Sequence, residues 1–307
     1  MGKLLIVGSL NMDMVIDVET MPKPGETILG KKLSFVPGGK GANQAYTCGK
    51  LGGDVSMIGA VGKDENGEKL LNNLQSVGVD TSGVQVLDYT VSGTAIITVN
   101  SQGENSIVVI SAANFELNKE HIDQHRHLIE ECDVVVLQLE VPLETVMYVA
   151  ELAKSLNKMV ILDPAPAQKS LPDRFLQHID IIKPNETELQ TLTGMSTESA
   201  QEIVEAAMSL INKGIDKVVV TIGSKGAVLV TKERHEVFPP RKVDVVDTTA
   251  AGDAFTASLA KKLVEGSTID EAIRFGNIVS SIVVTKKGAQ SSIPSYEEAI
   301  KVYNHYR

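Results

Sequence analysis

The sequence predicts an α/β fold, in which helices cover both faces of a doubly wound, mostly parallel sheet and a small antiparallel β lid is added. One observation is a set of continuous apolar runs without the alternation of a half-exposed strand, at residues 4–7, 134–139, 159–162, 179–182 and 217–222. Such runs are typical of strands buried on both faces. Helix-like stretches alternate with these runs, at residues 143–156, 199–213, 252–265 and 269–284. This alternation predicts parallel strands joined by crossover helices.

Two segments break the alternation and predict the lid. Residues at about 14–35 and 93–110 look like hairpin strands, and the second pair is joined by good turn residues at 101–105. A small sheet made from these two insertions would stand off the parallel sheet. The alternative is that they are edge strands of the main sheet. No repeat or clear interdomain linker is present, so one domain is expected over residues 1–307.

Composition narrows the class of protein. No apolar run approaches the roughly 20 residues that a membrane helix needs. The formal net charge of −10 argues against a nucleic-acid partner, whose phosphates would repel the chain. Cys48 and Cys132 have no metal-site spacing and are not expected to pair, which favours a reducing compartment. A cytoplasmic enzyme without a membrane partner is therefore expected.

The segment DTTAAGD, residues 247–253, carries the strongest chemical signal. It follows a strand-like run and opens a predicted helix, whose first N–H groups lack internal partners. Small residues there let a ligand approach the backbone, so this turn suits an anion. Asp253 directly follows these small residues and would be a base that takes a proton from a hydroxyl. The alternative is an acid that merely favours the helix dipole.

Two further segments are rich in ligand-binding residue types. GGKGANQA, residues 38–45, combines three glycines with Asn43, whose amide both donates and accepts, as polyol hydroxyls require. The alternative is a helix-opening turn with Asn43 in solvent. KPNETE, residues 183–188, follows a buried strand, and Asn185 and Glu188 could reach a hydrated Mg²⁺. They could equally form a capping box, and both roles can hold together. No P-loop motif is present, so any nucleotide is bound differently.

These segments together resemble the ribokinase-like sugar kinases. GGKGANQA and DTTAAGD match the two motif regions of that family. Further matches occur in family order: GSLNMD, PGET, QLE, PAPA, PNETE, TIGSKG and KGAQ, between residues 8 and 290. The resemblance runs from about residue 4 to 294, and so many short motifs in one order are highly specific.

The resemblance implies a role for each matching residue. Asp253 would be the catalytic base, and the backbone amides of Ala250, Ala251 and Gly252 would form an anion hole. The sugar would be bound by Asn11 and Asp13, expected at the end of the first strand, and by Gly39, Lys40, Asn43, Glu140 and Asp253. The ATP-binding positions are Asn185, Thr221, Gly223, Ser224, Gly226, Gly252 and Asn277. Asn185 and Glu188 would hold Mg²⁺ through water. An activating K⁺ would lie among Asp247, Thr249, Val283, Lys286, Gly288 and Ser292. Relatives usually form homodimers through the lid sheet.

The expected reaction is ATP-dependent phosphorylation of D-ribose at O5, giving D-ribose 5-phosphate. The resemblance favours ribose, because similar kinases of deoxyribose tend to carry an apolar residue at the position of Asn11. A site built to bond a hydroxyl rejects an analogue that lacks it. Phosphorylation of 2-deoxyribose or another sugar is the alternative. A non-catalytic sugar- or nucleotide-binding regulator is a different class, and a vitamin kinase is a weaker third. Lys183 and Asp163 depart from the residues common in the family, and the sequence offers no account of them.

Overall fold

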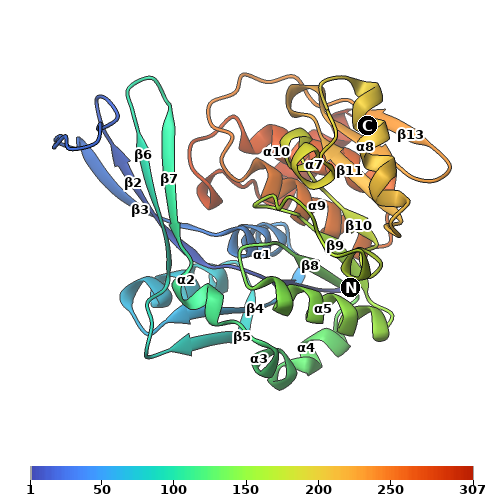
Figure 1. The fold of residues 1–307 in the computed structure, drawn as a ribbon, viewed down its shortest axis with the longest axis horizontal. Coiled ribbons are helices and arrows are strands. Elements are labelled where there is room, and N and C mark those ends of the chain that lie inside the picture. The colour runs from blue at the N-terminus through green and yellow to red at the C-terminus, as the bar shows by residue number, and fades with distance from the viewer. Residues whose placement is uncertain (1, 307) are drawn as a thin grey trace.

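The computed structural model describes residues 2–306, and a nine-stranded sheet forms the centre of the molecule (Figure 1). Its strand order is β13-β12-β11-β10-β9-β8-β1-β4-β5. All neighbouring strands are parallel except β11–β12 and β12–β13, which are antiparallel. The strands are β1 (Lys3–Val7), β4 (Asp54–Gly62), β5 (Asp80–Leu87), β8 (Val134–Leu137), β9 (Met159–Leu162), β10 (Ile181–Ile182), β11 (Lys217–Thr221), β12 (Ala227–Val230) and β13 (His235–Phe238). The predicted mostly parallel sheet is confirmed.

Helices cover both faces of this sheet. Leu4 and Ile6 of β1 pack against one group, and Leu5 and Val7 against the other, because successive side chains of a strand point to opposite faces. The first group is α1 (Lys40–Lys50), α2 (Glu65–Gln75), α9 (Ala251–Val264) and α10 (Ile269–Val283). The second is α3 (Lys119–Gln124), α4 (Arg126–Glu131), α5 (Leu143–Ser155), α6 (Asp173–Leu176), α7 (Glu186–Thr193) and α8 (Ala200–Ile211). The last helix, α11 (Tyr296–Tyr306), packs on α10.

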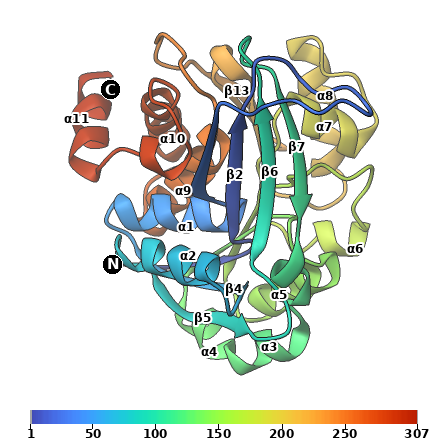
Figure 2. The same cartoon turned by 90° about the vertical axis from the view of Figure 1, so that its left-hand side faces the viewer.

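The lid is a separate four-stranded sheet beside the helices, seen face-on in Figure 2. Its order is β3-β2-β6-β7, from β2 (Asn11–Asp17), β3 (Lys32–Gly38), β6 (Gly93–Val99) and β7 (Asn105–Ile110). The two hairpins, β2–β3 and β6–β7, are antiparallel as expected. The central pair, β2–β6, is parallel, because the second insertion lies beside the first in the same direction. These strands are therefore not edge strands of the main sheet.

One expectation about the lid was wrong in position. Asn11 and Asp13 were expected at the end of the first strand, but β1 ends at Val7 and both residues lie on β2. The chain turns at residues 8–10, where a Cβ on Gly8 would lie 1.8 Å from Oε1 of Gln138. The lid thus begins three residues earlier than predicted and contains both expected sugar-binding side chains.

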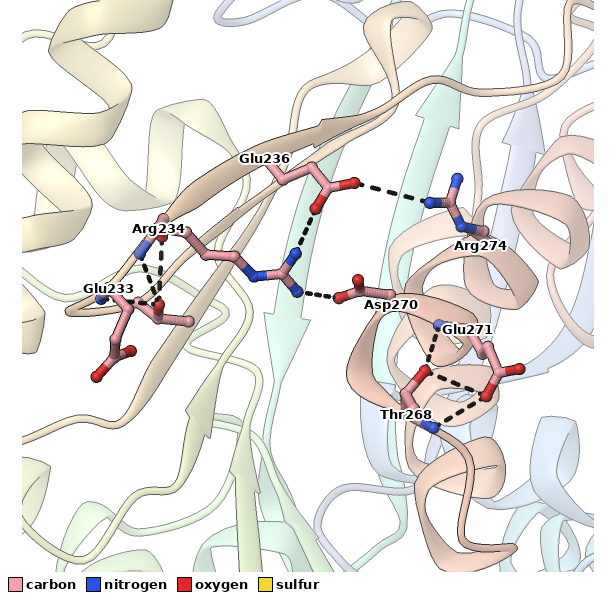
Figure 3. Close-up of polar contacts among 8 residues, drawn as sticks. Glu233, Arg234, Glu236, Thr268, Asp270, Glu271 and Arg274 are labelled. Carbon is pink, nitrogen blue, oxygen red and sulfur yellow. Dashed lines mark hydrogen bonds and ion pairs between the residues drawn. The ribbon is translucent and has the colours of Figure 1, made fainter.

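The hairpin β12–β13 is fastened to the start of α10 by charged side chains (Figure 3). The guanidinium of Arg234 contacts Glu236 of β13 and Asp270 of α10. Thr268 caps α10, since its hydroxyl accepts from the Glu271 N–H at 3.3 Å and Glu271 Oε2 accepts from the Thr268 N–H at 3.1 Å. These contacts hold β13 against the helix that carries Asn277. Within residues 2–306, no helix has the length and apolar character needed to span a membrane.

Candidate active site

The candidate site lies where the strand order of the main sheet changes direction. β1 lies between β4 and β8. From β1 the next strands of the sheet, β4 and β5, are added on one side, and β8, β9 and the later strands are added on the other. Open α/β sheets bind ligands outside the carboxyl ends of strands at such a point. Ser9 follows β1 and Glu140 follows β8, and the Ser9 hydroxyl donates to Glu140 Oε2 at 2.5 Å. Figure 1 shows the lid strands rising beside this edge of the sheet.

Asn11 and Asp13 lie on one face of β2, two residues apart in an extended strand. Asn11 is 3% exposed, and its Oδ1 accepts from Nδ2 of Asn114 at 2.8 Å. Asp13 is half-buried against Gly38 of β3, where a Cβ would lie 2.3 Å from Asp13 Oδ2. Only a glycine lets the two lid strands approach so closely at this carboxylate.

The glycine turn before α1 brings a lysine into the same site. Gly39 has φ +86°, and a Cβ there would lie 2.7 Å from the Asn11 nitrogen. The backbone N–H of Lys40 donates to Glu140 Oε2 at 3.0 Å. The attraction of the Asp253 carboxylate raises the pKa of Lys40, although burial opposes the rise. Lys40 is therefore a cation facing the proposed base.

Asn43 contacts Asp253 directly. Its Nδ2 donates to Asp253 Oδ2 at 2.8 Å, and its Oδ1 accepts from Nε2 of Gln290 at 3.1 Å. Both Asn43 and Asp253 are buried, at 7% and 6% exposure. The alternative of a solvated Asn43 therefore does not describe this geometry. Asp253 is a buried carboxylate held by a side chain from another helix.

Asp253 lies in the first turn of α9, whose N-terminus is open. Ala250, at the N-cap, has φ +59° and makes no side-chain capping bond. Positive φ is costly for a residue with a Cβ, and such strain concentrates at functional sites. Gly252 is exposed while Asp253 beside it is buried. The N–H of Ala251 donates to the Thr248 carbonyl oxygen at 3.2 Å. The N–H groups of Ala250 and Gly252 are therefore the backbone donors that this turn can present to an anion.

Two carboxylates of the site have perturbed pKa values. Burial raises the pKa of Asp253 to about 6, Lys40 opposes the rise, Asp163 adds to it, and Asn43 and Lys183 oppose it. Burial also raises the pKa of Asp13 to about 7, and the charges of Glu140 and Asp253 add to that rise. A carboxylate with a pKa near neutrality is suited to accept a proton at physiological pH.

The expected Mg²⁺ residues form the capping box of α7. Asn185 Oδ1 accepts from the Glu188 N–H, and Glu188 Oε2 accepts from the Asn185 N–H, both at 2.8 Å. The capping alternative is thus correct, and Oε1 of Glu188 takes no part in it. Asn185 also forms a β-bridge with Thr221. The side-chain oxygens of Asn185 and Glu188, at the start of α7, are of the kind that fits a hydrated Mg²⁺, which keeps most of its waters.

The expected nucleotide residues gather after β11. Gly223 and Ser224 are exposed in the turn η2 (Gly223–Lys225). Gly226 has φ +98°, and a Cβ there would lie 2.1 Å from the Phe238 carbonyl oxygen, so glycine is required. That same carbonyl accepts from Nδ2 of Asn277 at 2.9 Å. The Phe238 carbonyl at the end of β13 therefore links the turn after β11 to α10, and Thr221 ends β11 just before this turn.

Four of the expected cation residues lie on two loops that contact each other through Asp247: Asp247, Thr249, Lys286 and Gly288. Val283 is the last residue of α10, and Ser292 ends the turn η3 (Gln290–Ser292). Its Oδ1 accepts from the N–H and hydroxyl of Thr249 at 2.9 and 2.6 Å, and its Oδ2 from the Gly288 N–H at 2.8 Å. Burial would raise the pKa of Asp247, but these hydrogen bonds lower it overall. The Lys286 ammonium pairs with Glu298 at 2.9 Å. A carboxylate with hydroxyl and carbonyl oxygens is a donor set that suits a hard monovalent cation. The remaining expected members are Val283 and Ser292, both buried.

The sequence motifs missed Asn114, which lies in η1 (Ala112–Glu116). Besides bonding Asn11, its Oδ1 accepts from the Leu10 N–H at 2.9 Å and its Nδ2 donates to the Leu10 carbonyl at 3.1 Å. Asn114 is 1% exposed and so fixes the turn that leads into β2. The only local signal is a polar residue in the apolar-rich segment after the second hairpin.

Comparisons with known proteins agree with this geometry. A family model described as pfkB family carbohydrate kinase matches residues 1–296. A ribokinase of Haemophilus influenzae is 41% identical over 302 residues, which cover 98% of each chain. A deoxyribokinase of Salmonella typhi is 39% identical, covering 99% of this chain and 98% of the relative.

Solved structures are also similar over the whole chain. The structure of an Arabidopsis thaliana ribokinase complexed with ribose and ATP superposes with a TM-score of 0.92, at 34% identity and 98% coverage of both chains. A ribokinase of Giardia lamblia superposes with a TM-score of 0.93 at 27% identity, covering 100% of this chain and 99% of that one. The similarity includes the lid as well as the main sheet.

Proposed function

Because the chain belongs to the pfkB family of carbohydrate kinases, we propose that it transfers the γ-phosphoryl group of ATP to O5 of D-ribose, with Asp253 as the base. One observation carries the assignment of the base. Asp253 is buried at the uncapped N-terminus of α9 and is held by the side-chain amide of Asn43. A carboxylate that only served the structure would repel a phosphate bound beside it, whereas a proton acceptor is well placed there.

The proposed step is an in-line displacement. Asp253 accepts the proton of the sugar O5 hydroxyl as O5 bonds to the γ-phosphorus. The bond from that phosphorus to the β–γ bridging oxygen breaks, and its electron pair leaves with ADP. The amides of Ala250 and Gly252 stabilise the charge on the transferring group. Lys40, a cation facing Asp253, adds positive field at the same place.

The sugar hydroxyls are proposed to bond a set of side chains at the lid and the switch point. Asn11 contributes Nδ2, because its Oδ1 is engaged by Asn114. Glu140 and Asp13 offer carboxylate oxygens, and the Gly39 turn lets the sugar lie close to the backbone. Asn43 offers its second amide hydrogen while the first bonds Asp253. The complete proposed set is Asn11, Asp13, Gly39, Lys40, Asn43, Glu140 and Asp253.

ATP is proposed to bind along the carboxyl ends of β10 and β11 and the start of α9, contacting Asn185, Thr221, Gly223, Ser224, Gly226, Gly252 and Asn277. Mg²⁺, held through water by Asn185 and Glu188, would neutralise phosphate charge. K⁺ would be held by the loops that contain Asp247, Thr249, Val283, Lys286, Gly288 and Ser292. There it would add positive field beside the anion cradle without joining the chemistry.

Ribose is favoured over 2-deoxyribose by the buried amide of Asn11. The Salmonella deoxyribokinase relative makes 2-deoxyribose the second candidate. An assay of ADP release with D-ribose, 2-deoxy-D-ribose, D-fructose and adenosine in parallel tests the proposal. The highest kcat/KM is expected with ribose. Higher kcat/KM with deoxyribose would reverse the order of the two sugars. Absence of turnover with all four, with sugar binding retained, would favour a non-catalytic regulator.

We further propose a homodimer formed through the lid. The lid exposes apolar side chains on its two outer strands, which a partner lid would cover: Leu33 and Phe35 on β3, and Ile107, Val108, Val109 and Ile110 on β7. Light scattering of the wild type and of Phe35→Lys with Val109→Lys tests this, with a dimer expected only for the wild type. The chain is proposed to act as one domain, in the cytoplasm, where the buried thiols of Cys48 and Cys132 stay reduced.

A further inference from the structure

The two residues that depart from the family pattern, Asp163 and Lys183, form a buried ion pair. Lys183 Nζ lies 3.1 Å from Asp163 Oδ2, and the two side chains are 3% and 2% exposed. Asp163 follows β9 and Lys183 follows β10, which are adjacent parallel strands. Their carboxyl ends meet at one edge of the sheet, so the two unexplained charges lie beside each other at the candidate site.

Other elements hold the Asp163 carboxylate in place. Its Oδ2 also accepts from Gln44 Nε2 of α1 at 3.1 Å and from the Thr256 hydroxyl of α9 at 3.0 Å. Gln44 is in turn fixed by Gln138, whose Nε2 donates to Gln44 Oε1 at 2.6 Å. Oδ1 of Asp163 is buried without a hydrogen-bond partner among residues 2–306. The Lys183 ammonium is the ion-pair partner of this carboxylate, and the charge of Lys40 also acts on it.

The Lys183 ammonium lies against the first turn of α9. Nζ is 3.5 Å from the Gly252 carbonyl oxygen, and a Cβ on Gly252 would also lie 3.5 Å from Nζ, its nearest neighbour. Gly252 adjoins Asp253 and belongs to the proposed anion cradle. The ammonium thus places a full positive charge behind the turn where a helix N-terminus already favours negative charge.

Stability alone does not explain this pair. Burying two charges costs several kcal/mol per ion, and neutral replacements of both partners are often equally stable. Removing one partner is destabilising, because it leaves an unpaired buried charge. A pair placed directly behind an anion cradle is therefore better explained by its electric field.

We propose, on the basis of the function proposed above, that Lys183 is a positioning residue for phosphoryl transfer. Asp163 holds its ammonium, which supports the Gly252 turn and the negative charge that gathers on the cradle and on Asp253. Lys183 acts through the backbone of Gly252 and through its field, without contacting the sugar.

The effect on Asp253 provides a signature that a structural role lacks. Five groups from four places in the fold face Asp253: Asp13 on β2, Lys40 and Asn43 on α1, Asp163 after β9 and Lys183 after β10. Asp163 raises the pKa of Asp253 and Lys183 lowers it. Removing each charge separately must therefore move the proton affinity of the base in opposite directions.

The experiment compares Lys183→Met, Asp163→Asn and the double variant in the full-length protein. We expect Lys183→Met to lower kcat with ribose by about tenfold to a hundredfold, with smaller changes in KM. The acid limb of the kcat/KM profile should move to higher pH in Lys183→Met, to lower pH in Asp163→Asn, and return toward the wild type in the double variant. The double variant should keep its melting temperature but not regain kcat.

Lys154→Met is the matched control. Lys154 Nζ pairs with Asp180 Oδ1 at 2.6 Å, and Asp180 precedes β10, at the end of the strand opposite Lys183. This variant also removes one lysine of a partly buried pair, and it should leave kcat and the pH profile unchanged.

Three outcomes would overturn the proposal: wild-type kcat in the double variant, unchanged acid limbs in both single variants, or a double variant that no longer folds, which would assign the pair to folding. Each requires that the wild type phosphorylates ribose. A wild type inactive on every sugar tested would refute the proposed function instead, so the two failures are distinguishable.

Discussion

The side-chain amide of Asn114 donates to Oδ1 of Asn11 at a distance of 2.8 Å. This bond joins the segment after the second lid hairpin to the first strand of the lid. Asn114 also bonds both the N–H and the carbonyl of Leu10, so its own orientation is fixed. The Asn11 amide is consequently held with Nδ2 as its remaining hydrogen-bonding group. A donor presented in this way can read one hydroxyl of a sugar.

Asn11→Met should narrow the preference for ribose over 2-deoxyribose. Losing one hydrogen bond should lower kcat/KM for ribose about twofold to tenfold, equivalent to about 0.5–1.5 kcal/mol. Deoxyribose lacks the 2-hydroxyl and should lose little. The measurement is the ratio of kcat/KM for the two sugars in the wild type and the variant. An unchanged ratio would mean that Asn11 does not read this hydroxyl.

Asp253→Asn should lower kcat by roughly 10²–10⁴, the range for loss of a general base. The amide has nearly the same shape but cannot accept the O5 proton at neutral pH. The KM values for ATP and ribose should change little, because the cradle amides and sugar contacts remain. ADP release under saturating substrates measures the loss, with a melting curve as the control for folding. Turnover close to that of the wild type would exclude Asp253 as the base.

The value of kcat/KM should fall as the pH is lowered through about 6–7. The pKa of Asp253 is raised to about 6, so the base becomes protonated and inactive as the pH falls through that value. The pKa of Asp13 is raised to about 7, and its charge is coupled to Asp253, so the observed value belongs to the pair. The hydrogen bond from Asn43 lowers the pKa of Asp253.

Asn43→Ala provides the check on this assignment. Without the amide donor the ionised carboxylate is less stable, so the acid limb should move to higher pH. A limb that stays in place, or moves to lower pH, would show that another group controls the profile. The pH profile of kcat/KM is measured for the wild type and for Asn43→Ala from initial rates at limiting ribose and constant ionic strength.

Activity should rise several-fold when K⁺ replaces Na⁺ at constant ionic strength. Asp247 connects the two expected cation loops through Thr249 and Gly288, and these loops adjoin the start of α9. Asp247→Ala should abolish the response to K⁺ while leaving the reaction product unchanged. Equal rates in both salts for the wild type would argue against a cation at these loops.

Much of the candidate site could be predicted because its residues lie in short, unusual segments. Glycines around Lys40 and small residues before Asp253 indicate backbone that must approach a ligand, and this is a local property. The helix after Asp253 and the capping box at Asn185 were likewise visible in sequence. Short strands and helices without such motifs were not all assigned, since burial in the sheet decides them more than propensity does.

The sequence by itself determined the α/β class, the existence of a lid, and the motif residues from which a sugar kinase was predicted. Periodicity and motif spacing contain that information, because they are properties of neighbouring residues. The tertiary structure alone placed Asn11 on the lid, paired β2 with β6 in parallel, and brought Asn114 to Asn11. It also brought Asp163 to Lys183, 20 residues apart in sequence and 3.1 Å apart in space. Strand order and packing set which distant side chains meet, and no local pattern records that order.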